Sequence, residues 1–109
     1  MIRIVLAIVV TLVASSAEAQ DAALIKRGEA VYTAQKCSVC HSVAGKGNQR
    51  GALDKVGSKL SSDEIHQWIV AAPDMAAKTK ATRKPVMKAY TTLPKEDVDA
   101  LTAYLQSLK

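Results

Sequence analysis

Apolar residues recur with the period of an α-helix in three parts of this 109-residue chain. In the first part, the residues that share one face are Leu24, Ile25, Gly28, Val31 and Tyr32. Asp21 precedes them and is placed to cap the helix, because its carboxylate can accept hydrogen bonds from free N–H groups of the first turn. The pattern therefore predicts a first helix that is capped at residue 21.

The second helical pattern lies in the stretch SSDEIHQWIV, residues 61–70. Ser61 and Glu64 have the spacing of a capping box, in which each side chain binds the backbone N–H of the other residue. The apolar stripe of this helix consists of Ile65, Trp68 and Ile69. Pro73 is expected to end the helix, because proline disfavours helical backbone in the residue before it.

The third helical pattern is PKEDVDALTAYLQSLK, residues 94–109. Pro94 suits a first helical turn, and the carboxylates of Glu96 and Asp97 complement the positive end of the helix dipole. Its apolar stripe consists of Val98, Leu101, Leu105 and Leu108. Since no segment alternates with the period of a strand over a useful length, the sequence predicts an all-α fold.

The segments between these helices are long for so small a domain. A glycine-bearing loop covers residues 42–59, and an irregular stretch is expected over residues 73–93. The chain also has one Trp, three Tyr and no Phe, so large core side chains are scarce. The loops are long, and few large side chains are present to form a core beneath them. We therefore expect the loops to wrap around a bound group that fills the centre.

The N-terminus has the pattern of an export signal. Arg3 is followed by an apolar run over residues 4–14, and Ala17 to Ala19 match a signal peptidase site. The run is short for a membrane span, which needs about 20 residues. We therefore expect a cleaved signal peptide over residues 1–19, one domain over residues 20–109, and a periplasmic location.

The stretch QKCSVCHSVA, residues 35–44, contains both cysteines of the chain. A thioredoxin-like dithiol would need a βαβ context, and a structural zinc site would need a second pair of ligands where only His66 remains. A disulfide between residues three apart is geometrically awkward. The remaining interpretation includes His41, because C-x-x-C-H is the attachment motif of a c-type haem. Cys37 and Cys40 would then add to the porphyrin vinyl groups, and His41 would bind the iron.

At this point the chain resembles the class I c-type cytochromes over residues 21–109. The motifs that carry the resemblance, besides CSVCH, are the first-helix pair Gly28 and Tyr32 and the segments GALDKVG, SSDEIHQWI, KPVMKAY and ALTAYLQSL. The resemblance implies a cytochrome c fold, in which the first and last helices pack together around one covalently bound haem c. It implies that Gly28 allows Leu101 and Tyr104 to approach closely. It also implies that Trp68 lies beside a haem propionate.

One position departs from the family pattern. The family usually has a proline near Ala52, and the carbonyl of that proline accepts a hydrogen bond from the iron-binding imidazole. Any residue has a backbone carbonyl, so the bond can form without the proline. The orientation of His41, and the potential that this orientation tunes, depend on it.

The family places its second axial ligand just before the last helix, where KPVMKAY carries Met87. The resemblance therefore implies His41 and Met87 as the iron ligands. Met75, in APDMAAK, is the less favoured alternative, because most methionines fill gaps in a core. His66 lies one position away from the apolar stripe of the second helix, where a histidine is usually solvated or hydrogen-bonded.

The stretch KTKATRKPVMK, residues 78–88, contains bases and no acid. Its basic residues are Lys78, Lys80, Arg83, Lys84 and Lys88. Most such runs are solvated loops. This run precedes the expected ligand, so we expect it to border the haem edge and to attract acidic redox partners. The formal net charge of +5 agrees with acidic partners, and anionic lipid headgroups are a secondary attraction. Nucleic acid and stable membrane insertion are not expected.

These observations predict a monomeric, periplasmic one-electron carrier that is not an enzyme. Two alternatives stay open. One is a haem c electron-transfer subunit of a larger periplasmic oxidoreductase, which would have a persistent apolar interface. The other is a haem protein with an open site that binds a small ligand, which would need a vacant or labile sixth position.

Overall fold

The computed structural model describes residues 13–109 and contains five α-helices, two 3-10 helices and two short strands within that range. The elements in chain order are α1 (Val13–Ala34), η1 (Cys37–Val39), β1 (Ser42–Val43), β2 (Lys46–Gly47), η2 (Gln49–Gly51), α2 (Val56–Lys59), α3 (Ser62–Val70), α4 (Ala72–Thr79) and α5 (Lys95–Gln106). The strands form one antiparallel pair. Among the described residues, no helix has the length and apolar character that crossing a bilayer requires.

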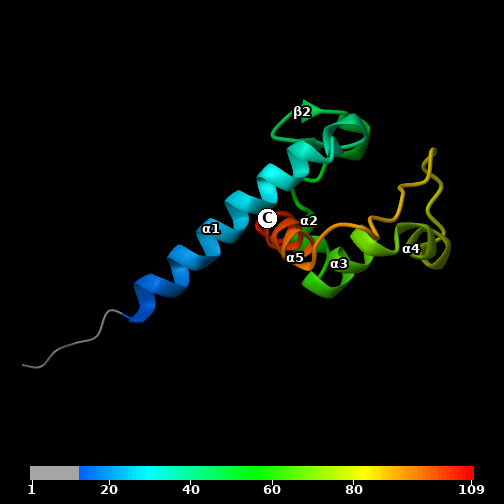
Figure 1. The fold of residues 1–109 in the computed structure, drawn as a ribbon. Coiled ribbons are helices and arrows are strands. Elements are labelled where there is room, and N and C mark those ends of the chain that lie inside the picture. Colours follow the sequence, from blue (N-terminus) through cyan, green and yellow to red (C-terminus); the bar gives the residue numbers. More distant parts are fainter. Residues whose placement is uncertain (1–12) are drawn as a thin grey trace, which may run out of the picture.

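Helices α1 and α5 cross and pack closely, although they stand at opposite ends of the sequence (Figure 1). Gly28 makes this approach possible, because a Cβ at this position would collide with the backbone carbonyl of Ala100 and lie 2.6 Å from the Cβ of Tyr104. Near this crossing, the rings of Tyr32 and Tyr104 meet edge to face with centroids 5.7 Å apart. The expected contact between the first and last helices is confirmed.

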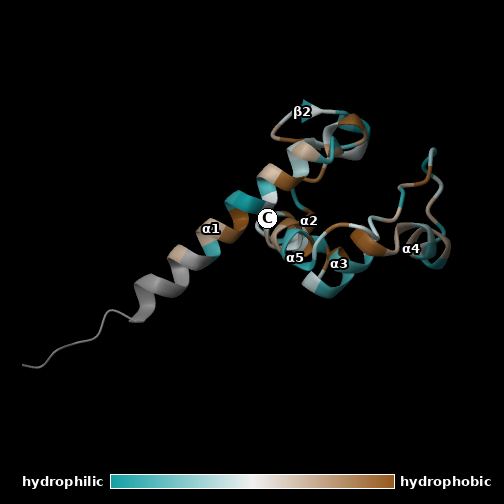
Figure 2. Ribbon diagram, in the orientation of Figure 1, coloured by the Kyte–Doolittle hydropathy of each residue, from teal (hydrophilic) through white to brown (hydrophobic). Residues whose placement is uncertain are grey.

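The hydrophobic core lies where α3 joins this pair of helices. Its buried residues are Val31, Tyr32, Ile65, Ile69, Val98, Leu101 and Tyr104. The helices contribute one apolar face each, and Figure 2 shows hydrophobic and hydrophilic residues along both α1 and α3. The capping box of α3 forms as expected, with Ser61 Oγ accepting from the Glu64 N–H and Glu64 Oε1 accepting from the Ser61 N–H.

Two local expectations are wrong. Helix α1 already runs from Val13, the first described residue, so Asp21 lies inside the helix and does not cap it. Helix α3 ends at Val70 as expected, but α4 starts directly after it. Pro73 lies in the first turn of α4, where its missing N–H has no partner to lose. The stretch predicted to be irregular over residues 73–93 therefore begins with a helix.

The expected signal peptide falls largely on residues whose structure is not described, since the described part begins at Val13. Helix α1 passes through the predicted cleavage site at Ala19. Cleavage at Ala19 stays a prediction.

Beyond α4, the chain runs through an extended segment to α5 (Figure 1). Helix α4 ends at Thr79, and the next residue, Lys80, has a left-handed backbone conformation with φ of 56°. The segment returns to the body of the protein at Tyr90, whose N–H donates to the carbonyl of Ile69 at 2.9 Å. Residues 81–90 thereby form one wall of a cavity against α3 and the Cys37–His41 turn.

Candidate functional site

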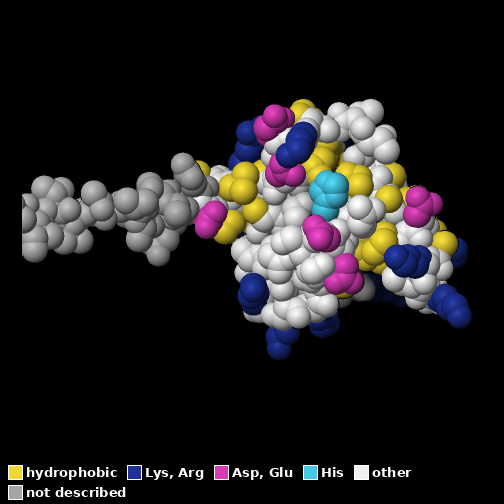
Figure 3. Space-filling model, turned by 90° about the horizontal axis from the view of Figure 1, so that it is seen from below, with side chains coloured by type: hydrophobic (Ala, Val, Ile, Leu, Met, Phe, Trp, Pro, Cys, Tyr) yellow, Lys and Arg dark blue, Asp and Glu magenta, His cyan; other side chains and the backbone are white. Residues whose placement is uncertain are grey.

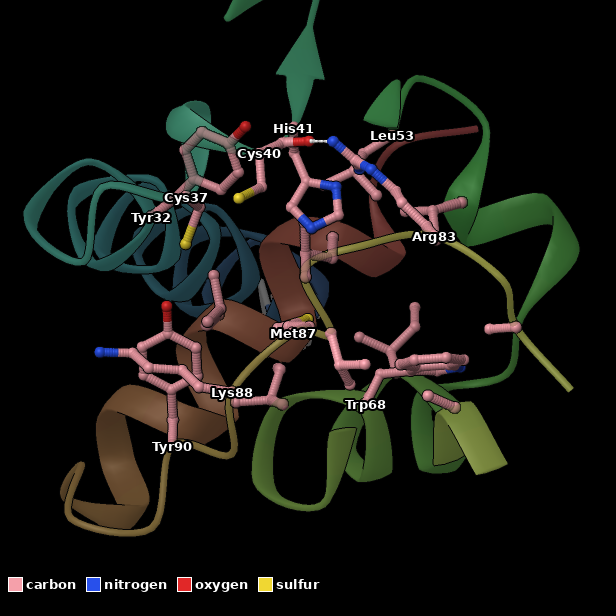
Figure 4. Close-up of a pocket in the computed structure, with 18 of the residues that line it drawn as sticks. Tyr32, Cys37, Cys40, His41, Leu53, Trp68, Arg83, Met87, Lys88 and Tyr90 are labelled. Carbon is pink, nitrogen blue, oxygen red and sulfur yellow. Dashed lines mark hydrogen bonds between the residues drawn. The ribbon is translucent and has the colours of Figure 1, made fainter. Parts of the chain in front are cut away.

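A cavity of about 550 Å³ lies between α3, α5, the Cys37–His41 turn and the segment before α5. Most of its walls are apolar, with Leu53, Ile65, Ile69, Leu101 and Leu105 among the residues that line it. A volume of this size is typical of sites that enclose a small molecule or cofactor. The expected space at the centre of the loops is therefore present (Figure 4).

Cys37, Cys40 and His41 come from one tight turn that follows α1. The turn is closed by the carbonyl of Cys37, which accepts from the N–H of His41 at 2.9 Å and from the N–H of Cys40 at 3.2 Å. This geometry brings both thiols and the imidazole to the same cavity (Figure 4). Local hydrogen bonding is sufficient for this arrangement, so five consecutive residues can present three reactive groups together.

The chemistry of the two cysteines can now be compared with the alternatives. Both are free, so no disulfide joins them. Residues 13–109 contain no cluster of three or more His, Cys, Asp or Glu side chains that could hold a metal ion, which argues against zinc within that range. Burial raises the pKa of the Cys37 thiol. Two thiols on the wall of an apolar cavity are suited to form covalent bonds with a large apolar group.

His41 is held in one orientation by the backbone of η2. Its Nδ1 lies 3.0 Å from the carbonyl oxygen of Gly51. A carbonyl only accepts, so Nδ1 carries the proton and Nε2 keeps a free lone pair, which faces the cavity in Figure 4. Burial lowers the pKa of His41 and thus favours the neutral form that can bind a metal. The hydrogen bond expected near Ala52 is made one residue earlier, without a proline.

Met87 lies across the cavity from His41, as Figure 4 shows. Both are half-buried. Met75 and His66 are also half-buried, but neither is among the described residues that line the cavity. The structure thus brings together an imidazole and a thioether on facing walls, and it places the two alternative side chains elsewhere.

Trp68 lies in the cavity wall on α3, away from the side where Cys37 and Cys40 stand (Figure 4). This is the side on which a porphyrin held through its vinyl groups by the two cysteines would place its propionates. Trp68 therefore lines the cavity, and its contact with a propionate stays a prediction.

Two tyrosines that line the cavity were not predicted to belong to the site. Tyr90 lines it beside Lys88, which was expected at its edge, and the Lys88 ammonium lies 4.8 Å from the centre of the Tyr90 ring. Tyr32 also lines it, and its buried hydroxyl has no hydrogen-bond partner among the described residues. Burial, with a smaller effect of nearby Cys37, raises the pKa of Tyr32 to about 12. The sequence signal for Tyr32 was its position on the apolar face of the first helix, which indicates burial but not which site the residue faces.

The bases of residues 78–88 are all exposed, and Lys and Arg side chains gather at the end of the molecule formed by α4 and the segment after it (Figure 3, right). Val86, 42% exposed, lies within the same segment and lines the cavity. Arg83 differs from the lysines, because its guanidinium turns to the cavity wall and donates to the carbonyl of Cys40. Of the five bases, Arg83 and Lys88 line the cavity, and Arg83 is bound to its wall.

The donor groups of the site are consistent with a c-type haem. They comprise two free thiols, an imidazole with its free nitrogen toward the cavity, and a thioether opposite, all within mostly apolar walls. A family model described as Cytochrome c matches residues 25–109. Searches of curated proteins and of solved structures found no match to the chain.

Proposed function

Since this chain belongs to the cytochrome c family, as the match over residues 25–109 shows, we propose that it is an exported one-electron carrier with His41 and Met87 as iron ligands. As a member of the family it has a covalently bound haem c and acts in electron transfer. The further steps, which are the ligand pair, the location and the docking face, are supported by the arguments below.

One observation carries the proposal. His41 and Met87 stand on facing walls of one cavity, and the free nitrogen of His41 is directed into it. When bound, the haem supplies a metal centre that gains and loses one electron. The thioether of Met87 would hold the iron from the wall opposite His41, which would stabilise the reduced iron and leave no position open to a small ligand. This closed arrangement favours a carrier over an enzyme.

The protein chain contributes position and environment. The Gly51 carbonyl holds the His41 ring in one orientation, so His41 would keep that orientation when the charge of a bound iron changes. Apolar side chains from α3 and α5 would keep water away from the bound haem. Such a site would change little on electron transfer, which would keep the barrier to the transfer low.

The basic residues that border the cavity are suited to guide a partner. Val86 and Lys88 line the cavity and are exposed, and the exposed Lys78, Lys80 and Lys84 belong to the stretch that leads to them, so an acidic partner would meet both charge and apolar surface there. Such charge raises the rate of encounter in a salt-dependent way. We expect a small and transient interface with an acidic electron-transfer protein, and a free monomer between encounters.

The proposed location rests on the N-terminal pattern of residues 1–19. We therefore place the working protein in the periplasm.

The test is the absorption spectrum of the holoprotein, produced with its N-terminal segment. The oxidised form should show the weak red sulfur-to-iron charge-transfer band, and the reduced form should show no shift with carbon monoxide. A high-spin spectrum, or ready binding of carbon monoxide, would show an open iron and favour a ligand-binding protein. A stable complex with another chain on purification would instead favour a subunit of a larger oxidoreductase.

A further inference from the structure

Arg83 connects two segments that are far apart in the sequence. It belongs to the extended segment between α4 and Met87, and its Nη2 donates to the carbonyl oxygen of Cys40 at 2.5 Å. Cys40 stands directly before His41 in the attachment turn. Figure 4 shows the hydrogen bond above the cavity, with Met87 below it. The guanidinium thus reaches from the segment of one proposed ligand to the turn of the other.

The glycine at position 51 provides the space for this contact. A Cβ on Gly51 would collide with Arg83 Nη1 and with the Cys40 carbonyl, and would lie 2.9 Å from Nδ1 of His41. The backbone of Gly51 is not in the left-handed region, so its conformation does not require glycine. Gly51 is therefore explained by the crowding of three groups: the guanidinium, the Cys40 carbonyl and the imidazole.

Few other hydrogen bonds hold the segment around Met87. Its two ends are fixed by Ala81, whose N–H donates to Ala76, and by Tyr90, whose N–H donates to Ile69. Between them, the bond from Arg83 to Cys40 is the one hydrogen bond that residues 82–89 make within the described part of the chain. The position of Met87 in the cavity depends on this bond more than on any regular secondary structure.

The charge of Arg83 also lies close to the iron site. Arg83 Nη1 and His41 Nδ1 crowd the same side of Gly51, so the guanidinium stands beside the imidazole and opposes any further positive charge there. The same repulsion disfavours the oxidised iron, which carries one more positive charge than the reduced iron. Arg83 is always charged, so this effect does not vary with pH in the physiological range.

We propose that Arg83 is a positioning residue that fastens the Met87 segment to the attachment turn and raises the reduction potential of the iron. The proposal rests on the ligand pair proposed above. The two effects of Arg83 can be separated. Its hydrogen bond keeps Met87 in place, and its positive charge raises the reduction potential. A lysine at position 83 would keep the charge and lose the planar donor geometry.

The test uses holoprotein with Arg83→Gln, Arg83→Lys and the matched control Lys84→Gln. Lys84 is the next residue, it is exposed, and its ammonium makes no hydrogen bond or ion pair with the described residues. Added imidazole competes with Met87, and its apparent Kd is measured from loss of the red charge-transfer band. The reduction potential of each variant is measured by spectroelectrochemical titration.

We expect Arg83→Gln to bind imidazole about tenfold more tightly than wild type, because a hydrogen bond from a charged donor has been lost and the segment opens more readily. Its potential should fall further than that of Lys84→Gln. Arg83→Lys should keep most of the potential and only part of the resistance to imidazole. If Arg83→Gln does not assemble, the imidazole affinities of Arg83→Lys and Lys84→Gln still test the hydrogen bond, and Arg83→Met replaces Arg83→Gln as the neutral variant for the potential.

Two results would overturn the proposal in different ways. Equal imidazole affinities and equal potentials for the Arg83 and Lys84 variants would show that Arg83 is an ordinary surface charge, with the ligand pair intact. Absence of the charge-transfer band in wild type would overturn the ligation by Met87 itself, and with it the role of Arg83.

Discussion

The carbonyl oxygen of Gly51 accepts a hydrogen bond from Nδ1 of His41 at 3.0 Å. This bond joins η2 to the attachment turn, and it determines which nitrogen of the ring faces the cavity. Because the acceptor belongs to the backbone, the bond depends on the path of the chain and not on the side chain at position 51. A residue with a side chain would still disturb it, by displacing the backbone.

We predict that Gly51→Ala destabilises the holoprotein by about 2 kcal/mol, because the new methyl group must displace Arg83 and the Cys40 carbonyl. Gly45→Ala is the control, since Gly45 has φ of +78° and no atom within 4 Å of the added Cβ. The control should show only the cost of a left-handed backbone, about 1 kcal/mol. Denaturant unfolding measures both, and a smaller loss for Gly51→Ala would show that position 51 is not crowded.

Gly28→Ala should separate the crossing of α1 and α5. The added methyl group would collide with the Ala100 carbonyl, and no flexible side chain is there to move aside. We expect a loss of about 3 kcal/mol in the free energy of unfolding, even though alanine favours the helix itself. Glu29→Ala, at the next and exposed position of α1, should leave the stability nearly unchanged. Thermal unfolding of the two variants that shows equal midpoints would contradict the close crossing.

Met87→Ala should abolish the red charge-transfer band and give a high-spin or misligated iron. Met75→Ala should leave the spectrum unchanged, because Met75 is not among the described residues that line the cavity. Oxidised spectra of the two holoproteins are sufficient for this comparison. A spectrum altered by the Met75 substitution alone would assign the ligand to Met75 and overturn the proposed pair.

Reversing the charge of exposed lysines in residues 78–88 should change the rate of reaction with small redox reagents, in a direction that depends on the charge of the reagent. Lys80→Glu with Lys84→Glu should slow oxidation of the reduced protein by anionic hexacyanoferrate(III) and speed oxidation by cationic hexaammineruthenium(III). Both effects should shrink as salt increases. Lys26→Glu with Lys59→Glu makes the same change of net charge on α1 and α2. Equal stopped-flow rates for the two double variants would show that electron transfer does not take place near Lys80 and Lys84.

Tyr32→Phe should be neutral or stabilising by about 1 kcal/mol near pH 7, because the lost hydroxyl is buried without a partner among the described residues. The folded protein holds the pKa of Tyr32 at about 12, above its usual 10.0. The contribution of this raised pKa to the free energy of unfolding is therefore fully present below pH 10, and it is lost as the pH rises toward 12. The free energy of unfolding should therefore decrease less between pH 7 and pH 11 in Tyr32→Phe than in wild type. A large loss of stability at pH 7 would mean that the hydroxyl has a partner in the holoprotein.

Local features of this protein were accessible from its sequence. The capping box of Ser61 and Glu64 depends on residues three apart, and the thiols and imidazole of CSVCH share one turn. Gly28 could be assigned to a helix contact because the family resemblance covered both ends of the chain. In each case the determining interactions are short in sequence or belong to a recurrent motif.

Only the tertiary structure decided the relations between distant segments. Periodicity could not show that α4 begins directly after α3, because a proline in a first turn and a proline that ends a helix look alike in sequence. The bond from Arg83 to Cys40 joins residues 43 positions apart, and the sequence pattern had indicated only that Arg83 borders the haem edge with the other bases. The choice of the Gly51 carbonyl, and the placement of Met87 rather than Met75 in the cavity wall, depend equally on the chain path. The physical reason is the same in each case. Which distant residues meet depends on how the whole chain packs, and a local sequence pattern does not contain that information.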